Sequence, residues 1–97
     1  MAVDINAYES IVVGDTAVGI TSTLINPASQ RKNDACWISI EGGPIRFRCD
    51  GTDPTATEGH LVDAGETIDV DGHDNLVRFR AIRTSAYATV LRVSIGR

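Results

Sequence analysis

The chain alternates apolar and polar residues in short runs that are separated by glycine, proline, asparagine and aspartate. No window keeps the three-to-four-residue apolar repeat of an amphipathic helix for long. The alternation therefore predicts strands at residues 8–13, 18–24, 35–41, 45–50, 67–71, 76–83 and 87–95. Short strands between frequent turns are typical of an all-β protein. We expect a small antiparallel β-sandwich, jelly-roll-like in topology, with residues 1–97 as a single domain.

Turn residues predict how these strands pair. A turn at Gly42-Gly43 predicts a hairpin between the strands on either side of it, with one wholly apolar face. The apolar pairs expected from this register are Ile40 with Ile45, Ile38 with Phe47, and Cys36 with Cys49. On the other face the same register sets Trp37 against Arg48 in a cation–π contact.

Two later turns, at residues 72–75 and 84–86, predict a three-stranded meander in the C-terminal half. In this meander Arg78 lies between Asp69 and Arg92, so cross-strand pairing neutralises part of the charge. The inward pairs expected from its register are Val70 with Val77, Ile68 with Phe79, Phe79 with Leu91, and Val77 with Val93.

Composition and net charge narrow the function classes. The 97 residues are 42% apolar and 23% charged, which is typical of a folded globular domain. No stretch of the sequence has the roughly 20 consecutive apolar residues that a membrane helix needs, and no apolar leader segment is visible. We therefore expect neither membrane insertion nor export. A net charge of −4 argues against a nucleic-acid partner, which would need a basic surface.

Charge is segregated along the chain. Residues 50–74 hold eight acids and no Lys or Arg, whereas residues 75–97 hold five arginines and no acid. Arginine outnumbers lysine eight to one, and interfaces favour arginine because its guanidinium is planar and weakly hydrated. A codon bias explains the same ratio equally well.

Cys36 and Cys49 are opposed in the expected hairpin, at a separation that a disulfide tolerates. Both face the core in that register, where cysteine commonly serves as a small apolar side chain, so a pair of buried free thiols is the favoured alternative. A metal site needs more ligands than these two, and the chain has no Cys-x-x-Cys motif or Cys/His cluster. We expect no metal and no cofactor.

The segment CDGTDPTATEGH, residues 49–60, concentrates acids, a histidine and a cysteine. Its glycines and its Asp-Pro-Thr suit successive turns, in which Asp and Thr side chains cap backbone N–H groups. The turn DVDGHDN, residues 69–75, lacks the spacing and closing Glu of a calcium loop. With no nucleophile elbow in the sequence, we expect no catalytic residues and no enzymatic activity. We interpret residues 49–60 as a shaped, acidic surface element that contacts a neighbouring subunit.

Two longer stretches, IRFRCDGTDPTATEGHLVDAGETIDVDG and NLVRFRAIRTSAYATVLRVSIG, carry a resemblance to a known class of proteins. They resemble small all-β proteins from the structural gene clusters of tailed bacteriophages and prophages. The shared pattern is approximate: R-x-R-x-DGT-x-PT, about four residues, G-x-x-L-x-x-G-[DE], a short strand, F-R-[AF]-I-R and a final strand. The similarity covers roughly residues 35–95. It falls on Arg46, Arg48, Asp50, Gly51, Thr52, Pro54, Thr55, Gly59, Leu61, Gly65, Glu66 and residues 79–83. Cys49 departs from it, because relatives more often have an aliphatic residue there. The resemblance implies a virion-associated structural protein of β-sandwich or jelly-roll type, with no enzymatic activity.

The leading hypothesis is a non-enzymatic virion structural protein that forms a symmetric homo-oligomer, most specifically a capsid decoration or cement protein. It would be located in the virion after assembly in the host cytoplasm. Its partners would be copies of itself and other virion proteins such as the major capsid protein, with no nucleic acid and no membrane. The expected interface residues are Arg80, Arg83 and Arg92 against Asp53, Glu58 and Asp63.

Two alternatives stay open. A ligand- or glycan-binding module of a phage head or tail fibre would use Trp37, Tyr87 and His60, and an exposed Trp37 beside a concave pocket would favour it. A cupin-like enzyme would hold a metal on His60 and His73, which metal analysis of the purified protein would test.

Overall fold

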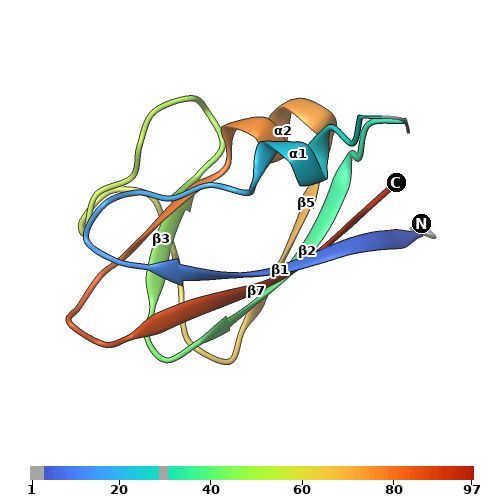
Figure 1. Ribbon diagram of the computed structural model, residues 1–97. Coiled ribbons are helices and arrows are strands. Elements are labelled where there is room, and N and C mark those ends of the chain that lie inside the picture. The colour runs from blue at the N-terminus through green and yellow to red at the C-terminus, as the bar shows by residue number, and fades with distance from the viewer. Residues whose placement is uncertain (1–3, 29–30) are drawn as a thin grey trace.

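Two antiparallel sheets form the fold, and two short helices lie side by side at one end of it (Figure 1). The computed structural model describes residues 4–28 and 31–97. The first sheet has the strand order β1-β7-β2-β5, and the second has the order β4-β3-β6. The strands are β1 (Ile5–Val13), β2 (Ala35–Glu41), β3 (Ile45–Arg48), β4 (His60–Val62), β5 (Thr67–Asp71), β6 (Arg80–Arg83) and β7 (Thr89–Gly96). The expected all-β class and antiparallel sandwich are confirmed.

The second sheet is extended by one isolated bridge. Val18 forms a single antiparallel bridge with Ala81 of β6, where a further strand of the second sheet would lie. Counted with this bridge, eight β segments divide evenly between the two sheets, as they do in a jelly roll. Because one segment is reduced to a single bridge, the structure is an antiparallel sandwich of a four-stranded and a three-stranded sheet, and the jelly-roll-like topology stays a prediction.

Apolar side chains that alternate along the strands fill the space between the sheets. On β7, Leu91, Val93 and Ile95 are fully buried, and Ile38 and Ile40 of β2 are buried against them in the same core. The other buried apolar residues are Val13, Ile20, Ile25, Ala35, Cys36, Ile45, Val70, Leu76, Phe79 and Ala81. The alternating pattern therefore identifies the inward faces of β2, β5 and β7 correctly.

The hairpin predicted around Gly42 is wrong, because the strands on either side of it belong to different sheets. Both edges of β2 are occupied, one by β7 and the other by β5. At the end of β2, Ile40 N–H donates to Glu66 O (3.1 Å) and Gly65 N–H donates to Ile40 O (2.8 Å). No edge is left for β3, which crosses to the other sheet. Gly42 permits the crossing, since its φ is 98° and a Cβ there would lie 1.8 Å from Ala88 O.

The predicted meander is wrong for the same reason. β5 pairs with β2, β6 pairs with β3, and β7 lies between β1 and β2. Trp37 consequently lies opposite Asp69 and Ser94 instead of Arg48. Arg78 does not join a cross-strand pair, because it lies in a helix.

Two segments predicted as strands contain helices, α1 (Ser22–Ile25) and α2 (His73–Arg78). In and after α2, Leu76 and Phe79 are fully buried while Val77 is exposed. Buried residues three positions apart mark one face of a helix, whereas the alternating interpretation placed Val77 and Phe79 inward. A short helix therefore replaces both the predicted turn and the start of the predicted strand.

A buried amide joins α1 to the paired ends of the first sheet. The Asn33 side chain is fully buried, and its Nδ2 donates to Leu24 O (2.6 Å) and Asn6 Oδ1 (3.0 Å). Its Oδ1 accepts from Asn6 Nδ2 (2.8 Å) and Arg97 Nη1 (3.3 Å), while its backbone N–H donates to Ile25 O (2.8 Å). This one residue therefore fixes α1 against β1 and β7.

Candidate functional site

The loop between β3 and β4, residues 49–59, folds back on β3. Arg46 holds it there, because its Nε donates to Ala56 O (3.1 Å) and its Nη1 donates to Gly59 O (2.8 Å). Pro54 is buried, and Gly59, with φ at 131°, comes so close that a Cβ there would lie 3.1 Å from Pro54 Cβ. The loop is thus a closed, packed connection, in agreement with its interpretation as a run of turns.

Asp50 pairs with an arginine inside this loop structure. Arg48 Nε donates to Asp50 Oδ1 (3.0 Å), and Arg48 Nη2 donates to Asp50 Oδ2. These two hydrogen bonds lower the pKa of Asp50 and raise the pKa of Arg48. Asp50 Oδ1 also accepts the Thr52 N–H (3.3 Å), which closes the first turn of the loop. The carboxylate therefore has a structural task.

A polar depression of about 340 Å³ lies at the base of the loop. Its lining residues are Arg48, Asp50, Glu58, Gly59 and His60. The His60 ring packs tilted against Phe47, with 5.3 Å between ring centroids. None of the lining residues is a hydroxyl or thiol nucleophile that His60 could activate. The depression can hold a small polar group but does not assemble a nucleophile and base.

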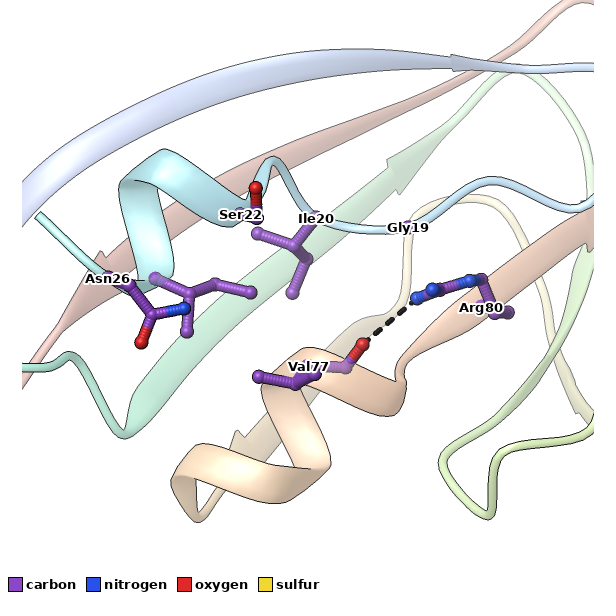
Figure 2. A pocket seen from close by; sticks show the side chains of 7 residues that line it. Gly19, Ile20, Ser22, Asn26, Val77 and Arg80 are labelled. Carbon is purple, nitrogen blue, oxygen red and sulfur yellow. Dashed lines mark hydrogen bonds between the residues drawn. The ribbon is translucent and has the colours of Figure 1, made fainter.

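A second depression, of about 350 Å³, opens between α1 and α2 (Figure 2). Ile20, Ile25 and Val77 give it apolar walls, and Gly19, Ser22, Asn26 and Arg80 complete its lining. Asn26 Oδ1 also accepts from His73 Nε2 (2.7 Å), which links the two helices. We call this depression the α1–α2 groove. Arg80 is the single charged residue among those that line it.

The exposed side of the four-stranded sheet, which we call the outer face, carries large apolar side chains. Ile5 (52% exposed), Tyr8 (57%), Val12 (75%) and Trp37 (52%) lie on it. Among them, Arg92 Nη1 donates to Ser10 Oγ (2.8 Å), and its Nη2 lies 3.2 Å from Glu41 Oε1. The register sets three rows across the strands: Tyr8, Ser94, Trp37 and Asp69; Ser10, Arg92, Ser39 and Thr67; Val12, Val90 and Glu41.

Two of the three expected interface arginines pair within the chain. Arg83 Nε donates to Asp15 Oδ1 (2.8 Å), and Arg83 Nη2 donates to Asp15 Oδ2 (3.1 Å). These two hydrogen bonds lower the pKa of Asp15. Hydrogen bonds to Glu41 and Tyr8 raise the pKa of Arg92. The acid partner of Arg83 was not among the expected residues, and no sequence signal connects positions that lie 68 residues apart.

The remaining expected interface residues stay accessible. Arg80 contacts only backbone carbonyls, those of Val77 (3.0 Å) and Phe79 (2.7 Å), among the described residues. Asp53, Glu58 and Asp63 are exposed in the loops on either side of β4. The structure thus separates the expected set into arginines that are already neutralised and one that is not.

Cys36 and Cys49 are free thiols that both contact the core. Burial raises the pKa of Cys36 to about 12, and burial also raises the pKa of the half-buried Cys49. Cys36 lies on β2 and Cys49 in the loop that follows β3, so the two are not opposed across a hairpin. Neither is poised as a thiolate nucleophile.

The side chains of the two alternative hypotheses do not converge on one pocket. Trp37 lies on the outer face, Tyr87 is exposed between β6 and β7, and His60 lines the loop depression. His73 instead bonds Asn26 at the α1–α2 groove. Within residues 4–28 and 31–97, no three His, Cys, Asp or Glu side chains are grouped to hold a metal. Over the same ranges no helix is long and apolar enough to span a membrane.

Comparison of the chain with protein-family models, curated proteins and solved structures finds no match.

Proposed function

We propose that this chain is a non-enzymatic structural protein of a tailed-bacteriophage virion, where it forms a symmetric homo-oligomer as a capsid decoration or cement protein. The observation that carries this proposal is the outer face, which presents Tyr8, Trp37 and Arg92 on the exposed side of the four-stranded sheet. Tyr, Trp and Arg are the residues that dominate binding energy at protein interfaces. These side chains line neither of the two depressions, so the face suits a protein partner better than a small substrate.

The motif of the phage resemblance also supports a structural role. Arg46, Arg48, Asp50, Pro54 and Gly59 are the residues that fold the β3–β4 loop onto β3. A pattern whose members hold one another in place supports a structural role for the loop.

The size of the outer face fits an oligomer contact. Four strands about 4.8 Å apart and about 3.3 Å per residue along the eight residues of β7 give roughly 500 Å² of sheet. A stable interface buries about 800 Å² per partner, so adjoining loops would supply the remainder. A twofold or higher symmetric arrangement of copies, or a copy seated on the capsid, would cover the exposed apolar side chains.

Sedimentation velocity and capsid binding test the proposal together. The wild-type protein should sediment as an oligomer and bind expanded capsids of its phage. The double variant Tyr8→Ala/Trp37→Ala should sediment as a monomer. Tyr87→Ala, which removes an exposed aromatic outside the outer face, serves as the matched control and should behave as wild type. A wild-type protein that stays monomeric at high concentration and ignores capsids would remove the basis of the proposal.

One observation favours the glycan-binding alternative, namely that the Trp37 side chain is half exposed. Sugar rings stack on such aromatic faces. Trp37 lines neither of the two depressions described above, which weakens this alternative. A glycan array probed with wild type and Trp37→Ala decides it, since a Trp37-dependent hit is required.

A further inference from the structure

Arg80 uses only part of its guanidinium. Nη1 donates to Val77 O (3.0 Å) and Phe79 O (2.7 Å), which caps the C-terminal end of α2. Within the described residues, Nε and Nη2 of Arg80 have no partner, and no carboxylate pairs with the residue. Two nitrogens that carry N–H donors are therefore without a hydrogen-bond partner among the described residues, on a side chain that lines the α1–α2 groove.

Among the described residues, no carboxylate neutralises the positive charge of Arg80. The register of the second sheet sets Arg48 directly opposite Arg80. Asp50 neutralises Arg48, whereas nothing described neutralises Arg80. Two opposed arginines repel each other, so an anion bound at the groove would stabilise this part of the sheet.

Gly19 sets the position of the Arg80 side chain. A Cβ at Gly19 would lie 2.5 Å from Arg80 Nη1, so only glycine lets the guanidinium lie this close to the backbone. Figure 2 shows the Arg80 side chain pointing toward Val77, and Ile20 lines the same groove. The fixed donor and the apolar walls thus belong to one groove.

We propose that the α1–α2 groove binds a short aliphatic carboxylate. The carboxylate oxygens accept hydrogen bonds from Nε and Nη2 of Arg80, whose planar fork matches two oxygens. The stem packs on Ile20, Ile25 and Val77, which line the groove. The groove, at about 350 Å³, lies at the small end of the roughly 300–1,000 Å³ typical of ligand pockets, so the stem holds a few carbons.

Backbone-amide NMR with sodium hexanoate as the probe tests this inference on the wild-type protein. Saturable shifts are expected at the amides of residues 19–22 and 77–80 and at the Arg80 Nε–H. Hexylammonium, which has the same stem and the opposite charge, should produce no such shifts. Acetate, which lacks the stem, should bind about tenfold more weakly or worse, because it buries several fewer methylene groups.

Variants test the role of Arg80. Arg80→Gln should weaken hexanoate at least about tenfold, since it removes a charge-assisted bidentate contact. Arg78→Gln, an exposed arginine of α2 that does not line the groove, should bind as wild type. Thermal unfolding of both variants establishes that they are folded, and the hexylammonium comparison needs no variant. Shifts outside the groove, equal shifts with hexylammonium, or unchanged affinity in Arg80→Gln would each overturn the proposal.

The same chemistry reaches the groove as a free acid or as a glutamate side chain of a neighbouring subunit. If a second copy supplies it, hexanoate should dissociate the oligomer and Arg80→Gln should sediment as a smaller species. If a free acid supplies it, hexanoate should bind while the oligomer stays intact. Because hexanoate binding is measured apart from self-association, a monomeric wild-type protein would sink the virion proposal and leave this one standing.

Discussion

Replacing the buried Asn33 should lower the free energy of unfolding substantially, because its side chain makes four hydrogen bonds. The Asn33→Ala variant removes four side-chain hydrogen bonds, to Leu24 O, to both amide atoms of Asn6 and to Arg97 Nη1. Each bond contributes about 0.5–1.5 kcal/mol net, and Leu24 O loses its side-chain partner in a buried setting. We expect a loss of about 2–4 kcal/mol in the free energy of unfolding.

The comparison variant is Asn6→Ala, which removes two of the same bonds at an exposed residue and leaves the Leu24 contact intact. Its expected cost is about 1 kcal/mol. Urea unfolding measures both, and an unchanged m-value indicates that the same surface is exposed on unfolding. For a domain of this size, each kcal/mol corresponds to about 4–8 °C in Tm. Equal losses for the two variants would refute the idea that Asn33 is the residue that ties α1 to the sheet.

Three further predictions concern the crossing turn, the thiols and the β3–β4 loop. Gly42→Ala should lower the free energy of unfolding by more than about 3 kcal/mol, because Gly42 has a positive φ and a Cβ there would clash with Ala88 O. The control Gly51→Ala, where φ is 89° and the space is open, should cost about 1 kcal/mol; chemical denaturation measures both. A thiol reagent at neutral to mildly alkaline pH should label Cys49 first and Cys36 only after unfolding, because burial raises the pKa of Cys36 to about 12. Equal labelling rates of the two cysteines in the native protein would contradict this prediction. The lowered pKa of Asp50 means that its ion pair stabilises the fold fully above the ordinary value of 3.8 and is lost as pH falls through the lower folded value. Asp50→Asn should therefore flatten the fall in unfolding midpoint below that pH, and an unaltered acid limb would count against the assignment.

The alternating pattern could predict which way side chains face but not which strands are neighbours. Ile38 and Val93 are assigned to the core correctly because alternation is a local property of each strand. Pairing depends on which edges are already occupied, and β2 receives both of its partners from later in the chain. Glycine pairs such as Gly42-Gly43 signal a reversal of direction without stating whether the chain stays in the same sheet.

The short helices escape prediction for a different reason. The six residues of α2 provide one buried position, Leu76, and Phe79 directly after the helix provides a second. Two positions are too short a sample to distinguish the period of a strand from that of a helix. The sequence likewise does not predict that Arg80, among the three expected interface arginines, lacks a carboxylate partner in the described part of the chain. This difference emerges only when Arg83 is found to pair with Asp15 and Arg92 with Glu41, contacts between distant parts of the chain.

The position of β7 has a consequence for how the protein is made. This strand follows every other strand in the chain, yet it lies between β1 and β2 in the first sheet. During synthesis β1 therefore stays unpaired, with its apolar side chains exposed, until β7 has been made. No stable half-structure is expected on the ribosome, and a chain cut short before β7 should be recognised as unfolded and degraded. Folding of the first sheet is thereby tied to the synthesis of β7.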